Sequence, residues 1–164
     1  LDLDNMVVFG WSEGAAVALW LAHLVPARVR ALVGWGGIAG LDDEDIAGFE
    51  TRRDTYAWSP RAQGAMDETF GPDYWRRVWC DWLDTMQRLR AQGSARLAPL
   101  ETIHQPVLVM HGGRDPLIRD VHPRRLAAAL PRAELHEITE GAHNVHLAFA
   151  EAFNARVKAF LATL

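Results

Sequence analysis

Four short, mainly apolar runs punctuate the chain, and a glycine follows each of them within three residues. The runs are Met6–Phe9, Val29–Trp35, Val107–His111 and Ala133–Ile138. Apolar runs of this length, bounded by glycine or proline, are typical of buried β-strands. The pattern therefore predicts four strands.

Helical patterns lie between and after these runs. They cover Ser12–Leu24, Val121–Leu130 and Val145–Leu161. In these segments apolar residues recur at helical spacing, or alanine and leucine dominate. Alternation of strand and helix implies parallel strands joined by right-handed crossovers. We therefore predict an α/β protein whose functional side chains follow the carboxyl ends of the strands.

One long stretch, residues 38–104, contains no convincing strand. It divides into three helical patterns, at residues 41–58, 59–71 and 72–93. Ser59 followed by proline is typical of a helix start, and Gly93 of a helix end. A plain crossover between strands is much shorter than this stretch. We therefore expect a helical cap at residues 38–104 that covers the strand ends of a core formed by residues 1–37 and 105–164.

Three tryptophans, Trp75, Trp79 and Trp82, fall on one face of the third helical pattern. Packing against neighbouring helices is the simpler interpretation of such a stripe. The alternative is an apolar wall for a substrate, with Trp58 as a further member.

Composition narrows the possible classes of function. The 164 residues are 49% hydrophobic and 23% charged, as in an ordinary folded domain, and the net charge of −4 comes without a basic patch for nucleic acid. No apolar run is long enough to predict a membrane span. Cys80, the one cysteine, has no partner for an internal disulfide, and no cluster has metal-ligand spacing. We therefore predict no metal, no cofactor, and neither nucleic acid nor membrane as a partner.

The sequence "GWSEG" places Ser12 between Gly10 and Gly14, where the first strand gives way to a helix. A serine on such a sharp turn projects out of the sheet, and we expect glycine at both flanking positions because side chains there would clash. The hydroxyl then lies at the amino end of a helix, where the helix dipole favours negative charge. Chance occurrence is the alternative, but the position between strand and helix favours a nucleophile.

Asp115 and His143 are candidates for the partners that a serine nucleophile needs. Asp115 follows the third strand, and His143 follows the fourth. In a catalytic triad the histidine takes the proton of the hydroxyl, and the carboxylate orients the histidine. Taken separately, the aspartate also fits a turn and the histidine a surface loop, but the chain order Ser12, Asp115, His143 favours a triad. His111 and His146 could also line the site, although packing is the favoured role for both.

Five segments spread over nearly the whole chain carry a more specific signal. They read "GWSEG", "WGGIAGLDDED", "WSPRAQ", "HGGRDPLI" and "EGAHNVHLAFAEAFN". Together they resemble the α/β-hydrolase superfamily, and within it the valacyclovir hydrolases, also called biphenyl hydrolase-like proteins. The resemblance implies the C-terminal part of an α/β-hydrolase fold, with a parallel sheet and a helical cap insertion. It also implies hydrolysis of α-amino acid esters, with Ser12 as nucleophile, Asp115 as orienting acid and His143 as base.

Glu13 follows the serine directly, where this family typically has aspartate and then two glycines; here Gly14 and Ala15 follow instead. The backbone N–H at this position normally donates to the oxyanion hole. The carboxylate would repel the negative intermediate by about 3 kcal/mol at about 6 Å and an effective dielectric of about 20. A cationic group between them would remove that cost. We therefore predict that Glu13 binds the ammonium group of the substrate, the alternative being a solvated glutamate at a helix start.

The leading hypothesis is a serine hydrolase that cleaves small carboxylic esters, with α-amino acid esters favoured, through an acyl-enzyme. A second hypothesis is hydrolysis of carbon–carbon bonds in ring-cleavage products by the same triad, which Glu13 disfavours because those substrates are anions. A third is a non-catalytic protein that keeps the fold as a binding scaffold. The intact Ser12, Asp115 and His143 disfavour this third hypothesis.

The chain begins at Leu1, only a few residues before the first strand. The resemblance implies several earlier strands and a loop that supplies the second oxyanion donor. We therefore expect a piece of a longer hydrolase, poorly stable by itself, with an exposed apolar edge at Met6–Phe9 and little or no activity alone. A cytoplasmic location is expected, with a mitochondrial address in a preceding segment as the alternative. The sequence leaves the oligomeric state open.

Overall fold

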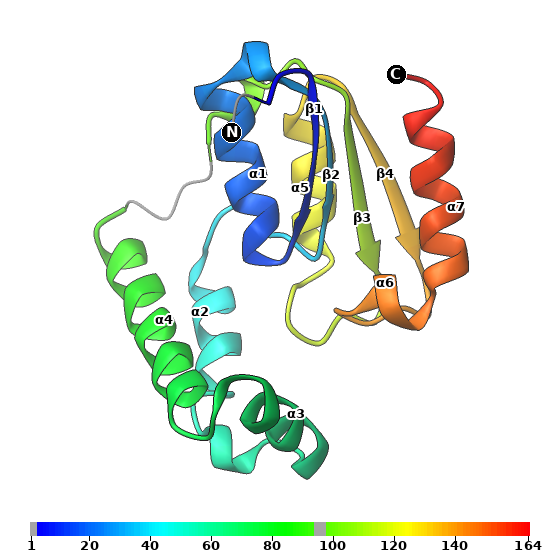
Figure 1. The fold of residues 1–164 in the computed structure, drawn as a ribbon. Coiled ribbons are helices and arrows are strands. Elements are labelled where there is room, and N and C mark those ends of the chain that lie inside the picture. Colours follow the sequence, from blue (N-terminus) through cyan, green and yellow to red (C-terminus); the bar gives the residue numbers. More distant parts are fainter. Residues whose placement is uncertain (1–2, 94–97) are drawn as a thin grey trace. The chain divides into compact units, whose positions relative to one another are not determined.

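The computed structural model describes residues 3–93 and 98–164. These residues form two compact units, one of residues 3–40 with 98–164 and one of residues 41–93. The first unit holds a sheet and the helices that pack on it (Figure 1). The described part of the second unit contains helices and no strand.

Among the described residues the sheet has four parallel strands, as the sequence predicts. They are β1 (Met6–Trp11), β2 (Val29–Trp35), β3 (Val107–Gly112) and β4 (Ala133–Ile138), in the spatial order β1-β2-β3-β4. The register pairs Gly10 with Gly34, and Trp35 with Met110. Because every pair of neighbours is parallel, the four carboxyl ends lie along one edge of the sheet, where functional residues of such folds collect.

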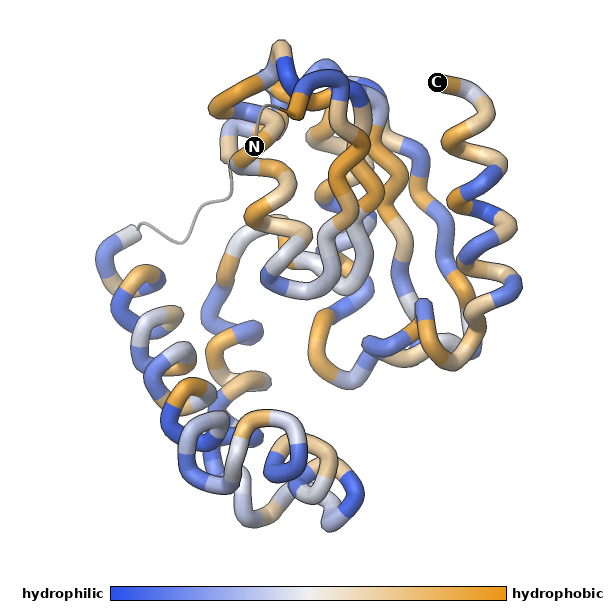
Figure 2. The backbone as a smooth tube through the Cα atoms, viewed as in Figure 1, coloured by the Kyte–Doolittle hydropathy of each residue, from blue (hydrophilic) through white to orange (hydrophobic). Residues whose placement is uncertain are grey.

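Side chains on both faces of the sheet are buried against helices. The covering helices are α1 (Glu13–Leu24), α5 (Val121–Ala129) and α7 (Ala150–Leu161). Leu32 of β2 belongs to a cluster with α1 and α5, whereas its neighbours Ala31 and Val33 belong to a cluster with α7. Figure 1 shows these helices on opposite faces, and Figure 2 shows hydrophobic residues concentrated along the central strands. Burial on two faces explains why β2 and β3 are mainly apolar along their whole length and do not alternate apolar with polar residues.

The outer strand β1 pairs only with β2 among the described residues. Its Phe9 is 49% exposed, whereas Met6, Val7 and Val8 are partly buried, so the apolar edge predicted at Met6–Phe9 is exposed only at its last residue. Val17 and Trp20 on the adjoining helix α1 are exposed as well. This side of the first unit therefore presents apolar side chains that the described core does not cover.

The last helical pattern is interrupted in the structure. The sequence predicts one helix over residues 145–161, whereas the structure has α6 (Val145–Ala148) and α7, separated at Phe149. Phe149 has a φ of −126° and a ψ of 43°, outside the helical region, and it packs against the core cluster under α7. Apolar spacing does not reveal such a break, because residues on both sides of it still reach the same core.

The helices of the second unit begin and end at recognisable caps. They are α2 (Asp43–Glu50), α3 (Pro60–Phe70) and α4 (Tyr74–Ala91). The hydroxyl of Ser59 accepts a hydrogen bond from the amide of Ala62 at 3.2 Å, which confirms the predicted start of α3. Gly93 follows α4 with a φ of +67°, which only glycine adopts without strain, and confirms the predicted end.

The first predicted helix of this unit is shorter than expected. The sequence predicts helix over residues 41–58, whereas α2 ends at Glu50 and Thr55–Ala57 forms a separate 3₁₀ turn. The carboxylate of Asp54 accepts a hydrogen bond from the amide of Tyr56 at 3.0 Å and so caps a new turn. Aspartate competes in this way with helix continuation, and the pattern of apolar residues does not report it.

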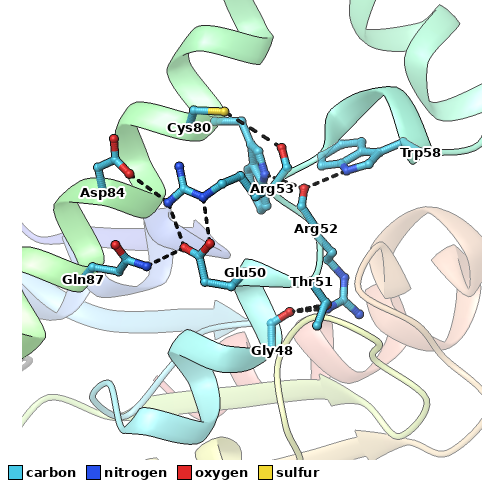
Figure 3. Close-up of polar contacts among 10 residues, drawn as sticks. Gly48, Glu50, Thr51, Arg52, Arg53, Trp58, Cys80, Asp84 and Gln87 are labelled. Carbon is cyan, nitrogen blue, oxygen red and sulfur yellow. Dashed lines mark hydrogen bonds and ion pairs between the residues drawn. The ribbon is translucent and has the colours of Figure 1, made fainter.

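Polar contacts tie this interrupted segment to α4 (Figure 3). The carbonyl of Arg52 accepts hydrogen bonds from the indole N–H groups of Trp58, at 3.0 Å, and Trp79, at 2.9 Å. The guanidinium of Arg53 lies between Glu50, at 2.7 Å, and Asp84 on α4, at 2.8 Å. These contacts hold the segment after α2 against α4. A helix that continued through this segment would not place Arg52 and Arg53 in these contacts.

The tryptophans of the second unit pack against one another. Trp58 contacts Trp75 and Trp79, with ring centroids 5.2 Å apart in both pairs, and Trp79 stacks on Trp82 at 5.4 Å. Trp75 is almost fully buried. These tryptophans therefore make packing contacts, as the simpler interpretation of the stripe expects.

Candidate active site

Ser12 occupies a strained turn between β1 and α1. Its φ of 55° and ψ of −121° lie in a region that residues other than glycine rarely adopt. Its amide donates a hydrogen bond to the carbonyl of Trp35 at 2.8 Å, and its own carbonyl accepts one from the amide of Ala15 at 3.0 Å. Bonds from β2 and α1 thus hold the sharp strand-to-helix turn that the motif predicts.

The two glycines of the motif have different roles. A Cβ atom at Gly10 would lie 2.3 Å from the carbonyl oxygen of Gly14, so no side chain fits there. A Cβ atom at Gly14 would meet nothing within 4 Å. The expectation of a steric requirement is therefore right for Gly10 and wrong for Gly14, because the first turn of α1 points that position into open space.

Two further glycines, at the end of β2, allow the close approach of chain segments to the turn, and the sequence reasoning missed them. Gly36 has a φ of +60°, and a Cβ atom on it would lie 3.0 Å from Cε1 of His143. A Cβ atom on Gly37 would lie 2.8 Å from the Cβ of Ala15. The signal was a glycine pair directly after a predicted strand, which is also a common sign of an ordinary turn.

Asp115 and His143 meet in a hydrogen bond beyond the ends of β3 and β4. Nδ1 of His143 lies 2.8 Å from Oδ2 of Asp115, and the two side chains are only 11% and 1% exposed. The other carboxylate oxygen of Asp115 accepts hydrogen bonds from the amides of Leu117, at 2.8 Å, and Ile118, at 3.0 Å. Both oxygens are therefore occupied, and the carboxylate has one fixed orientation.

The electrostatic surroundings keep Asp115 ionised. Burial raises the pKa of its carboxyl, but the hydrogen bond and positive charge of His143 and the two backbone amides lower it, and the pKa ends below its ordinary value. An ionised acceptor on Nδ1 requires that this nitrogen carries a proton. Nε2 of His143 is then the nitrogen with the free lone pair, which is the one that a general base uses.

The contacts between His143 and the Ser12 turn run through neighbouring residues. The indole N–H of Trp11, directly before Ser12, donates a hydrogen bond to the His143 carbonyl at 3.3 Å, and the two rings lie 5.5 Å apart. Within the described part of the chain, the Ser12 hydroxyl makes no side-chain hydrogen bond. Contacts between nucleophile and base are often long before substrate binds. The structure thus joins Asp115 to His143 and brings His143 beside the turn that carries Ser12.

Glu13 is the first residue of α1 and is exposed. Among the described residues, its carboxylate has no hydrogen-bond or ion-pair partner. Its amide lies in the first turn of a helix, where backbone N–H groups have no acceptor within the helix. Both its charge and its amide are thus free to act on a bound molecule.

The buried histidine His111 is the next-to-last residue of β3, at the same edge of the sheet. It is 2% exposed, and burial lowers its pKa. His146 is partly buried, and its Nδ1 accepts a hydrogen bond from the indole N–H of Trp35 at 3.0 Å. Both histidines pack inside the unit, in agreement with the role that the sequence favours for them.

Residues 3–93 and 98–164 contain no group of three histidine, cysteine or acidic side chains that could hold a metal ion. The same residues include no helix that is both long enough and apolar enough to cross a membrane. Cys80, in the second unit, is a free thiol whose sulfur lies 3.9 Å from the carbonyl oxygen of Arg53.

The alpha/beta hydrolase family model matches residues 2–156, and the chain belongs to this family. Among its relatives is the protein named serine hydrolase BPHL, from Mus musculus and from Homo sapiens. Each is 32% identical to this chain over 163 residues, which is 98% of this chain and 56% of the relative. The resemblance predicted from the sequence motifs is thus confirmed, and the chain spans a little over half the length of these relatives.

Solved structures show the same fold. One is 2-hydroxy-6-oxo-6-phenylhexa-2,4-dienoate hydrolase from Rhodococcus sp. strain RHA1, with a TM-score of 0.75 and 19% identity over 97% of this chain and 64% of that one. Another is NosK from Streptomyces actuosus, with a TM-score of 0.75 and 18% identity over 94% of this chain and 68% of that one. The predicted fold class, an α/β-hydrolase fold with a parallel sheet, is confirmed.

Proposed function

We propose that the protein containing this chain is a serine esterase in which Ser12 is the nucleophile, His143 the base and Asp115 the orienting acid. The observation that carries the proposal is the 2.8 Å hydrogen bond between Asp115 and His143, next to the strained turn of Ser12. The relatives named serine hydrolase support the same class of reaction.

The proposed reaction has two halves. Nε2 of His143 takes the proton of the Ser12 hydroxyl while Oγ attacks the ester carbonyl, and the carbonyl electrons move onto its oxygen. The tetrahedral intermediate collapses, and the alcohol leaves with the proton from His143. Water then attacks the acyl-enzyme by the same route and releases the acid. Asp115 stabilises the imidazolium that forms in each half, which its ionised state allows.

The amide of Glu13 is the proposed donor to the oxyanion. It directly follows the nucleophile and lies at the amino end of α1, where the helix dipole also favours negative charge. A loss of one such donor typically slows a reaction by about a hundredfold to a thousandfold.

The carboxylate of Glu13 is the proposed binding group for a substrate ammonium. It stands next to the place where negative charge develops, and the described residues leave it without a partner. The oxyanion formed from an uncharged ester would be repelled there by up to about 3 kcal/mol, at about 6 Å and an effective dielectric of about 20. An α-amino acid ester brings a cation between the two charges, so it is the substrate class that this residue favours. The proposed partner is therefore a small cationic ester.

A fluorophosphonate probe tests the nucleophile directly. Applied to the full natural protein, it should label the peptide that contains Ser12, and Ser12→Ala should abolish the label. Ser59→Ala, which removes only a helix cap, is the matched control and should label like the wild type. Absence of label on wild-type protein, or label on another residue, would refute the esterase proposal. A panel of aminoacyl esters, simple acyl esters and a ring-cleavage product then identifies the substrate class.

A further inference from the structure

A cluster of four rings lies next to the candidate active site, and the proposed mechanism uses none of them. His146 of α6 lies 5.1 Å from Trp11, 5.2 Å from Trp35 and 6.1 Å from Phe153, measured between ring centroids. These rings come from the ends of β1 and β2 and from α7. His146 is thus the ring that joins the three elements.

The hydrogen bond of His146 fixes the position of its proton. The indole N–H of Trp35 donates to Nδ1 of His146 at 3.0 Å. An indole N–H can only donate, so Nδ1 must carry a lone pair and the proton must be on Nε2. A second proton on Nδ1 would break this bond. Burial and the neighbouring charge of His143 also lower the pKa of His146, which keeps the ring neutral.

Trp11 links this neutral ring to the candidate catalytic base. Its indole packs on both His143 and His146, and its N–H holds the backbone carbonyl of His143 at 3.3 Å. Trp11 also precedes Ser12 in the chain. The Trp11 indole therefore links the Ser12 turn to the backbone of His143. The ring of His146 packs against this indole and supports it.

Resting on the proposed esterase function, we propose that His146 is a positioning residue. Held by Trp35 in its neutral form, with the proton on Nε2, it supports the Trp11 indole that fixes His143 beside Ser12. Neutrality matters because His143 becomes a cation during the reaction. His143 is the titratable neighbour that acts on His146, and a charged ring at residue 146 would oppose that step.

Two variants of His146 test the role in the full natural protein. In His146→Asn the side-chain oxygen can stand where Nδ1 stood and accept the Trp35 bond without ever becoming charged. In His146→Leu the indole N–H loses its acceptor. We expect His146→Leu to lower kcat by between about tenfold and a hundredfold with little change in KM, as for a displaced catalytic group. His146→Asn should recover most of that loss, and the control His136→Asn, on β4, should behave like the wild type.

Active-site titration with the fluorophosphonate probe separates positioning from loss of folded protein, because kcat is then expressed per reactive serine. An unchanged kcat per site in His146→Leu would overturn the positioning role while leaving the esterase proposal intact. A wild-type protein that neither labels nor hydrolyses any ester would refute the esterase proposal, and the positioning role with it.

Nitrogen NMR of the histidine rings gives a readout that does not depend on activity. As the pH falls, His146 should keep the neutral form, protonated on Nε2, below the ordinary titration range of a histidine. Trp35→Phe keeps a ring against Phe153 but removes the donor, so His146 should then take up its proton at higher pH than in the wild type. Protonation of Nδ1 in the neutral wild-type ring, or an unchanged titration in Trp35→Phe, would refute the proposed tautomer and its support by Trp35.

Discussion

Asp115 and His143 are 28 positions apart in the chain, yet Oδ2 of the carboxylate lies 2.8 Å from Nδ1 of the imidazole. The other carboxylate oxygen binds two backbone amides of the loop after β3, so the loop fixes the carboxylate and the carboxylate fixes the ring. The hydrogen bonds that fix the orientation of the Asp115 carboxylate thus also favour its ionised form. Burial raises the pKa of Asp115, but His143 and, to a smaller extent, these two loop amides lower it below its ordinary value.

The first prediction concerns the orientation of the base. Asp115→Asn should keep the shape of the site, but an amide in place of the carboxylate removes the ionised acceptor that holds the proton on Nδ1. By analogy with other triads, kcat should fall by about a thousandfold to ten-thousandfold. Ester hydrolysis at neutral pH measures this. The control Asp120→Asn, with an exposed carboxylate near the start of α5, should change kcat little, and a loss of less than about tenfold in Asp115→Asn would contradict the assigned role.

The second prediction concerns stability in acid. Because the pKa of Asp115 is lower in the folded protein than its ordinary value, its contribution to stability is fully present above about pH 4 and is lost as the pH falls through the folded value. Urea denaturation of wild type and Asp115→Asn, from about pH 6 down to about pH 2.5, should give a stability difference that shrinks as the pH falls. A pH-independent difference for Asp115→Asn would contradict the lowered pKa.

The sequence predicts the strands and the Ser12 turn because each depends on local residues. An apolar run closed by glycine is enough for β2, and the spacing of Gly10 and Ser12 is enough for the turn. Gly14 was misjudged because its surroundings depend on the direction in which α1 leaves the turn. The break at Phe149 was missed because the apolar spacing continues through it.

Long-range polar pairs were beyond sequence reasoning for a different reason. The bond between Trp35 and His146 joins positions 111 residues apart, and it depends on the registers of β2 with β3 and of β3 with β4. The period of apolar residues predicts where each helix and strand lies. It does not predict which two side chains from different elements come into contact. The candidate triad was accessible because its chain order is itself a family pattern.

The third prediction concerns the two glycines around Ser12. Gly10→Ala places a Cβ atom 2.3 Å from a backbone oxygen, so it should lower the free energy of unfolding by about 2 kcal/mol or more and reduce probe labelling. Gly14→Ala, in the first turn of α1, meets open space and should instead raise stability by up to about 1 kcal/mol. Urea denaturation compares them. Equal destabilisation by both variants would show that the turn differs from the structure described.

The fourth prediction concerns charge next to the nucleophile. Glu13→Gln keeps the backbone amide and the size of the side chain but removes the charge. For an α-amino acid ester, kcat/KM should fall, because the ammonium loses its partner. For the des-amino analogue it should rise, because the oxyanion is no longer repelled. Since Glu13 is exposed, water screens both effects, and each should be about 1 kcal/mol, or about fivefold.

The comparison of two substrates separates recognition from general damage to the site. Glu101→Gln, which changes another exposed glutamate of the first unit, should leave both kcat/KM values as in the wild type. The predicted effects should also weaken as salt is added, because exposed charges are screened within about 10 Å at about 0.1 M salt. If Glu13→Gln lowers kcat/KM equally for both esters, the Glu13 carboxylate does not bind the substrate ammonium. The residue then contributes only to the structure of the turn around Ser12.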